Sequence, residues 1–175
     1  MTTYPPLASG TRLTGSLLRS MVPSTFFKQT ATPRNTTTTL ANDPELAGIP
    51  LATGLYRIHF YGFMTQASTT PKLKGRWGFT GTWNNPDRNV IGPGQSNTAA
   101  PTDAASANFA GAQATGQDVI VSTSTSVVWS SWRETATNVF VTVAGNLSYQ
   151  WAQSVSNASN VTLQAESGFE IRRIG

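Results

Sequence analysis

The sequence has no cysteine, a single histidine and few charged residues. The lack of cysteine excludes a disulfide framework, a zinc-thiolate site and a cysteine nucleophile, and it leaves the redox compartment open. Charged residues make up 11% of the chain, about half of the usual share. No apolar run approaches the roughly 18 residues of a membrane helix, and the first residues lack the basic start and apolar stretch of a signal peptide. We therefore expect a soluble chain with no membrane partner.

Hydroxyl and amide side chains supply most of the polarity that charge does not. Of the 175 residues, 43 are serine or threonine and 11 are asparagine, alongside 15 glycines and 10 prolines. These residue types favour strands and turns over helices. Five Trp, four Tyr and eight Phe provide ample apolar surface for a chain whose length suits one domain. The sequence therefore predicts a single all-β domain.

The formal charge of +4 belongs to the N-terminal segment. Residues 1–34 contain Arg12, Arg19, Lys28 and Arg34 and no acid, whereas the rest of the chain contains eight basic and eight acidic side chains. Nucleic-acid binding requires a denser basic patch interleaved with aromatic residues. We expect instead an arm over residues 1–34 that docks on an acidic protein surface, with an ordinary solvated segment as the alternative.

Apolar residues at helical spacing predict a short helix in this arm. Leu13, Leu17 and Met21 recur every fourth residue, with Leu18 alongside, and Pro23 ends the run. A helix of this length is marginal in isolation. It therefore needs a support, which is either its own domain or a larger assembly to which the helix anchors the molecule.

Strand periodicity dominates from Phe26 onward. Residues 55–64 are apolar on both faces, which implies that the second face is covered by another part of the chain or by another subunit. Further strand patterns occupy residues 76–83, 119–129, 137–143, 147–155 and the C-terminal segment. About eight strands separated by turns predict a sandwich, a jelly roll or a barrel. Residues 93–118 are small and polar, and we expect them to form one long surface loop.

Few residues could support catalysis. His59 lies within a predicted strand and far in sequence from any glycine-framed serine, so we interpret it as a structural or interface histidine. One histidine and no cysteine also argue against a transition-metal site. The eight carboxylates show no spacing that indicates a glycosidase pair. We predict a non-enzymatic protein without a cofactor, and a polysaccharide-cleaving enzyme remains the weakest alternative.

Aromatic and amide residues in one segment admit two interpretations. Trp77 and Trp83 could stack on sugar rings. Polar groups for sugar hydroxyls follow at Asn84, Asn85 and Asp87. The alternation of both Trp with Phe79 instead favours a core position for the two indoles. The glycan-binding interpretation stays open beside the core interpretation.

Three stretches of the chain, taken in order, carry a resemblance to a known family. In residues 7–46 an arm precedes a lysine, a Thr-rich strand and an Asp-Pro-Glu-Leu turn. In residues 54–83 an aromatic strand and a turn precede a strand with Trp and Phe. In residues 147–175 a Trp-Ala-Gln segment and a polar turn precede a final Glu-Ile-Arg-Arg-Ile. Together the stretches resemble small bacteriophage virion proteins of the minor tail and decoration type.

The resemblance implies a jelly-roll domain similar to the trimeric tumour-necrosis-factor and C1q type, used on virions as a decoration, fibre or tail-tip module. Closed symmetry would then cover a shared apolar face. The expected anchor to the virion comprises Arg12, Leu13, Leu17, Leu18, Arg19, Met21, Phe26, Phe27 and Lys28. The expected subunit interface comprises His59, Tyr61, Phe63, Tyr149 and Trp151.

The prediction is therefore a non-enzymatic virion subunit, a homotrimer that binds capsid or tail proteins through residues 1–34 and carries a jelly roll over residues 35–175. The alternative is a receptor-binding module at the tail. Such a module would recognise host surface glycans through Trp77, Trp83 and the 93–118 loop.

Overall fold

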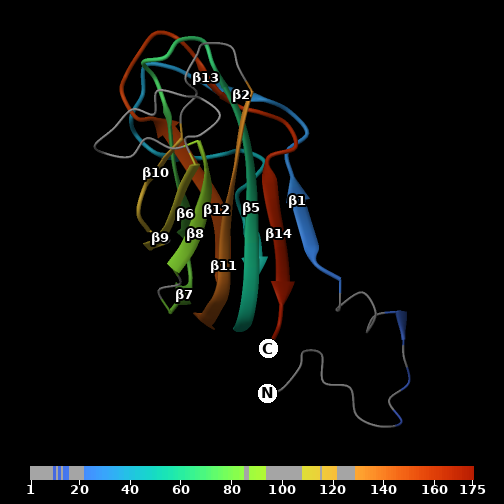
Figure 1. Cartoon of the computed structure of the whole chain (residues 1–175). Helices are drawn as coiled ribbons and strands as arrows, with labels where there is room; N and C mark the ends of the chain where they lie inside the picture. The colour runs from blue at the N-terminus through green and yellow to red at the C-terminus, as the bar shows by residue number, and fades with distance from the viewer. Residues whose placement is uncertain are drawn as a thin grey trace.

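The computed structural model describes residues 10, 12, 14, 15, 22–84, 87–93, 108–114, 116–121 and 129–175. The elements of this part of the chain are β-strands, and their pairings are antiparallel (Figure 1). The strands lie in two sheets, as expected for a β-sandwich. The all-β prediction is confirmed. No helix in the described ranges is long and apolar enough to cross a bilayer.

The larger sheet has nine strands in the described part of the chain. They are β1 (Ser24–Phe27), β2 (Thr32–Arg34), β5 (Gly54–Gln66), β7 (Thr82–Trp83), β8 (Asp87–Pro93), β9 (Asn108–Ala114), β11 (Ser130–Val143), β13 (Val161–Leu163) and β14 (Gly168–Arg173). Six of them follow the order β1-β14-β5-β11-β8-β9. In addition, β13 pairs with β5 and β2, and β7 pairs with β11.

The smaller sheet has five strands among the described residues. They are β3 (Ala41–Asn42), β4 (Ile49–Leu51), β6 (Leu73–Phe79), β10 (Val119–Val121) and β12 (Gly145–Gln153). The main order is β10-β6-β12-β3, and β4 pairs with β12.

Alternating apolar residues of the two sheets form one core. In β5, Ile58 and Phe60 are fully buried, whereas the alternating residues Arg57 and His59 are exposed and partly exposed. The ring of Tyr149 from β12 stacks on Phe60 with centroids 4.0 Å apart, and Phe169 from β14 packs at 5.0 Å from the same ring. Central strands from both sheets are therefore joined by direct aromatic packing.

A buried ion pair joins β8 and β11. Arg88 Nη1 of β8 lies 3.1 Å from Glu134 Oε2 of β11, and neither side chain is exposed. Trp132 Nε1 donates a 2.9 Å hydrogen bond to Glu134 Oε1, and Arg88 Nη2 donates to the carbonyl oxygen of Gln117, just before β10. Arg88 thus links β8 of the larger sheet to the segment before β10, an edge strand of the smaller sheet.

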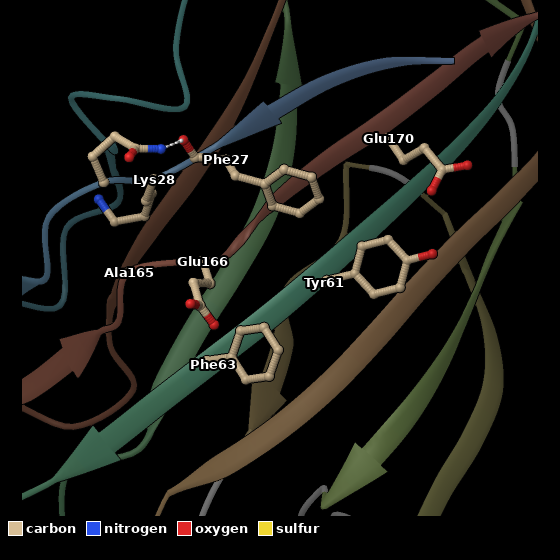
Figure 2. Close-up of a pocket in the computed structure, with 8 residues that line it drawn as sticks. Phe27, Lys28, Tyr61, Phe63, Ala165, Glu166 and Glu170 are labelled. Carbon is tan, nitrogen blue, oxygen red and sulfur yellow. Dashed lines mark hydrogen bonds between the residues drawn. The ribbon is translucent and has the colours of Figure 1, made fainter. Parts of the chain in front are cut away.

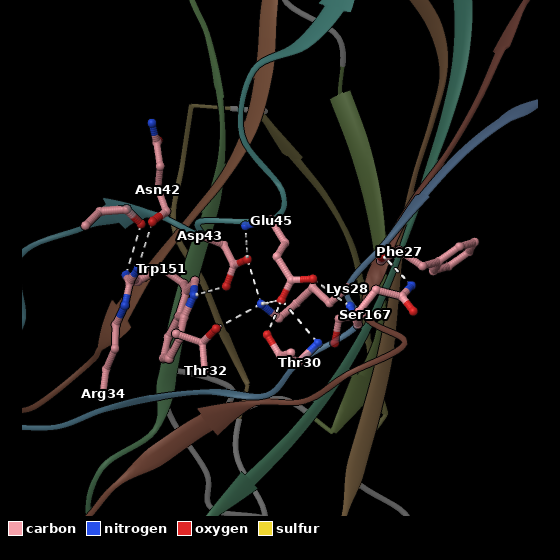
Figure 3. A network of polar contacts seen from close by, with 12 residues as sticks. Phe27, Lys28, Thr30, Thr32, Arg34, Asn42, Asp43, Glu45, Trp151 and Ser167 are labelled. Carbon is pink, nitrogen blue, oxygen red and sulfur yellow. Dashed lines mark hydrogen bonds and ion pairs between the residues drawn. The ribbon is translucent and has the colours of Figure 1, made fainter.

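A second buried ion pair holds the N-terminal strands in place (Figure 3). Lys28 Nζ lies 2.7 Å from Asp43 Oδ1 and donates a 2.9 Å hydrogen bond to Thr32 Oγ1. Trp151 Nε1 donates to Asp43 Oδ2 at 3.1 Å. The residues between β1 and β2 are thereby fixed against the turn after β3.

The sheets correct two boundaries predicted from the sequence. Residues 24–34 belong to the body rather than to an arm, because β1 pairs with β14 and β2 pairs with β13. The predicted loop over residues 93–118 contains β9, which pairs with β8 over its whole length. An edge strand of small residues shows no alternation of apolar side chains, so its sequence resembles a loop. Most of the predicted helix lies outside the described residues, and no N-terminal helix appears among the described elements.

Candidate docking face

The candidate site is the outer face of the nine-stranded sheet, on the side opposite to the core. The residues of β5 that point to this side are Leu55, Arg57, His59, Tyr61 and Phe63, which alternate with buried residues. Arg57 is exposed and the other four are partly exposed. This is the second apolar face that the sequence predicts for residues 55–64. We refer to it as the outer face.

Strand register aligns a row of residues across the outer face. Tyr61 of β5 lies opposite Gly168 of β14 on one side and Arg133 of β11 on the other. Gly168 in turn lies opposite Phe27, and Arg133 lies opposite Ile91. Phe27 and Ile91 are 40% and 42% exposed. Aromatic residues and arginine are enriched in protein interfaces, so the composition of this row is typical of a docking surface.

A hollow of about 730 Å³ opens on this face beside β1, β14 and β5 (Figure 2). Phe27, Tyr61 and Phe63 supply its aromatic walls, and Glu166 and Glu170 supply carboxylates. The centroids of the Phe27 and Tyr61 rings lie 6.3 Å apart.

Gly168 lets the hollow exist at this place in the sheet. It lies between Phe27 and Tyr61 in the register. A Cβ atom at this position would lie 2.3 Å from the backbone oxygen of Phe26 and 2.5 Å from Cδ1 of Phe27, so any larger residue would displace both the backbone of β1 and that ring. The hollow therefore depends on the missing side chain in β14.

The outer face carries charges without partners in the described part of the chain. Four carboxylates form ion pairs with described residues: Asp43 and Glu134 in buried pairs, Glu45 and Asp118 at partly exposed sites. Glu166 and Glu170 form no ion pair with any described residue, and the same holds for Arg57, Arg133 and Arg172. All five lie on the outer face or at the rim of its hollow.

His59 lies among these charges. Its Nδ1 is 3.1 Å from Thr135 Oγ1, and its ring stacks on Tyr61 with centroids 6.4 Å apart. Burial lowers the pKa of His59 below its usual 6.5; Arg57 and Arg133 lower it further, while Glu170 opposes the shift. The imidazole is therefore neutral at neutral pH and offers a flat polar surface. Among the described residues no group of three His, Asp or Glu side chains could hold a metal ion.

The structure corrects two of the predicted interface residues. Tyr149 and Trp151 are fully buried, because β12 is a central strand whose inward side chains pack on the other sheet. Trp151 also has the guanidinium of Arg34 4.3 Å from its ring centroid. Neither side chain therefore has exposed surface that a second copy could contact. His59, Tyr61 and Phe63 do lie on the outer face.

The predicted anchor residues lie in different environments. Phe26 packs against the core, Phe27 lines the hollow and Arg12 is exposed. Lys28 is fully buried with Asp43 and is not available to a virion partner, which corrects its predicted role. The remaining predicted anchor residues lie outside the described ranges; they are Leu13, Leu17, Leu18, Arg19 and Met21.

The predicted glycan platform is not assembled by the described residues. Trp77 is 2% exposed and meets the Phe169 ring edge-on at 5.6 Å, so its glycan-binding role is corrected to a core role. Trp83 is partly buried and stacks on Phe79 at 4.6 Å. Asn84 is exposed, and its backbone N–H donates to the carbonyl oxygen of Phe140. Asn85 and the side chain of Asp87 lie outside the described part of the chain.

Sequence reasoning misses the residues that complete the outer face. Gly168, Glu170, Arg133 and Ile91 belong to strands that flank β5 or lie beyond its neighbour, and no motif marks them. Only the pairing of the strands brings them beside Tyr61. The sequence matches no known protein family, and no curated protein matches it.

Proposed function

We propose that this chain is a non-enzymatic structural protein of a bacteriophage virion, a capsid decoration or minor structural subunit that assembles as a homo-oligomer. The observation that carries the proposal is the outer face, on which aromatic and arginine side chains lie in register without a covering layer of described residues. Such a composition suits binding rather than catalysis.

The N-terminal segment supports attachment to a particle. The first paired residue of the body is Ser24 in the edge strand β1. The residues before it include Arg12 and Arg19, no acid, and the apolar residues Leu13, Leu17 and Met21. A basic and apolar segment of this kind suits an acidic protein surface with apolar recesses. We place the anchor in residues 1–23, which is shorter than the sequence alone predicts.

The arrangement of the two sheets supports a jelly roll of the tumour-necrosis-factor and C1q type. Both sheets are antiparallel, and neighbouring strands such as β14 and β5, or β12 and β3, are far apart in sequence. Long crossovers between the two sheets of a sandwich are a feature of that topology. Threefold symmetry is the oligomeric state that the resemblance implies.

The decisive test is attachment to particles. Full-length protein and a variant that lacks residues 1–23 are each mixed with virions that lack the subunit, and bound protein is measured after sedimentation of the particles. We expect full-length protein to bind with a fixed copy number and the truncated variant to stay in solution. Failure of the full-length chain to bind any particle, or full occupancy by the truncated variant, would contradict the proposal.

A receptor-binding role is the second candidate. Trp129, just before β11, is 64% exposed, and exposed indoles stack on sugar rings. A receptor-binding module added as free protein would block adsorption of phage to its host, whereas a decoration subunit would leave adsorption unchanged. Replacing Trp129 with Ala tests whether any such inhibition depends on this indole.

A further inference from the structure

Two carboxylates at the hollow and two arginines further along the same strands lie on the outer face. Glu166 and Glu170 line the hollow near Phe63 and Tyr61. Arg57 and Arg172 lie further along β5 and β14, where they are directly opposite each other in the register. Like charges that face each other across an antiparallel pair are destabilising. Each copy therefore exposes a carboxylate pair and an arginine pair on one surface.

We infer that the hollow receives an arginine side chain from a second copy of this chain, supplied by the Arg57–Arg172 pair of that copy. A guanidinium is planar, stacks on aromatic rings and forms paired hydrogen bonds with carboxylates. The walls of the hollow offer both features, with Phe27 and Tyr61 as rings and Glu170 as a carboxylate (Figure 2).

Charge complementarity identifies the occupant as another copy. Within the described part of the chain, the acids that lack an ion pair are the two at the hollow, and three arginines without an ion pair lie on the same face. When two copies pack through this face, the arginines of each copy can form ion pairs with the carboxylates of the other. The same complementarity operates in a twofold pair or in a closed ring.

Association also covers apolar surface that the single copy leaves in water. Phe27 is 40% exposed and Ile91 is 42% exposed. They lie in the row that contains Tyr61 and Arg133. Burial of this row around a paired guanidinium removes water from the ion pair and strengthens it. The aromatic walls and the charges thus both stabilise the association of two copies.

The inference rests on the homo-oligomer of the proposed function, but its test uses the purified full-length chain without particles. Failure of this test leaves attachment through residues 1–23 untouched, and failure of attachment leaves this test untouched. Sedimentation velocity over a range of protein concentrations gives the association constant and the number of copies.

Charge reversal tests the contact directly. We expect Glu170→Arg and Arg57→Glu each to weaken self-association at least about tenfold, since each places like charges together. The double variant Glu170→Arg/Arg57→Glu restores opposite charges across the contact and should recover most of the association. Lys72→Glu, a reversal next to β6 of the other sheet, should associate as the wild type does.

Three results would overturn the inference. The first is a wild-type chain that remains monomeric at all accessible concentrations. The second is self-association unchanged by both single reversals, or lost equally in Lys72→Glu. The third is a folded double variant that fails to recover association. Circular dichroism of each variant verifies the fold, and Arg57 is exposed while Glu170 is partly exposed, so both substitutions are compatible with folding.

Discussion

Lys28 Nζ lies 2.7 Å from Asp43 Oδ1, and neither side chain is exposed to solvent. The two residues belong to the link after β1 and to the turn after β3, so the pair connects segments associated with different sheets. Asp43 also accepts a hydrogen bond from the indole of Trp151. The lysine that the sequence assigns to an arm and the aspartate of the Asp-Pro-Glu-Leu turn are therefore parts of one structural contact in the body.

Removal of either partner of this pair should destabilise the protein strongly. Lys28→Met leaves the buried carboxylate of Asp43 without its lysine, which typically costs about 3–5 kcal/mol. Asp43→Asn leaves Lys28 with only the partly exposed carboxylate of Glu45 at 3.6 Å, and should cost somewhat less. The double variant should lose less than the sum of the two, because it leaves no buried charge. Urea denaturation measures the free energy of unfolding. Asp118→Asn is the matched control, since Asp118 pairs with Arg76 at a partly exposed site and should cost about 1 kcal/mol or less. Equal losses in the buried and partly exposed pairs would contradict the interpretation.

Truncation should distinguish the body from the anchor. Deletion of residues 1–23 removes no described strand, so the midpoint of thermal unfolding should stay within a few degrees of the wild type. Deletion of residues 1–34 removes β1, β2 and Lys28 and leaves Asp43 unpaired. This variant should be unfolded or strongly destabilised. Differential scanning calorimetry measures both variants, and similar stability of the two would place the boundary of the body after Arg34.

Acid should weaken the contacts of Glu45. Hydrogen bonds from Thr30 Oγ1 and from the backbone N–H groups of Gln29 and Thr30, with a smaller contribution from Lys28, lower the pKa of Glu45 from 4.5 to about 2. A carboxylate with a lowered pKa stabilises the fold fully above 4.5, and this contribution is lost as the pH falls toward 2. In Glu45→Gln the decline of thermal stability between pH 4.5 and 2 should be shallower than in the wild type. An unchanged slope would show that Glu45 does not contribute.

His59 should produce a separate dependence on pH. Its pKa in the folded chain is below 6.5, so the folded state binds fewer protons than the unfolded state as the pH falls below 6.5. Stability is therefore complete above pH 6.5 and decreases under acidic conditions. His59→Gln keeps a polar group beside Thr135 and cannot take up a proton, so thermal unfolding between pH 7 and 5 should become less dependent on pH. A steeper dependence in the variant would refute the predicted sign.

Local periodicity in the sequence predicts where strands lie, but not what each face of a strand packs against. The alternation in residues 55–64 predicts a strand with two apolar faces, and β5 has one face in the core and the other on the outer face. The same kind of alternation at Tyr149 and Trp151 predicts an interface, yet both residues are in the core. Alternation is identical for a strand that packs on its own second sheet and for one that packs on another subunit. Only the arrangement of the sheets separates the two cases.

The sequence also does not indicate which charged residues are buried or which residues they pair with. Lys28 lies 15 residues from Asp43 and has no local signal that it is buried. Arg88 and Glu134 meet because β8 pairs with β11. Assignment of Lys28 to an anchor fails for this reason, since a basic residue in a basic segment gives no indication of a partner elsewhere in the chain.

The pairing of Ser24 with Ile171 means that the polypeptide enters the body beside its last strand. A cargo domain fused after Gly175 would therefore emerge next to the N-terminal segment and compete with it for space. The bend at residues 67–70, which follows the far end of β5, points to the opposite pole and is mostly exposed. For peptide display, insertion at that bend is the better choice, because the entry point of the chain stays clear.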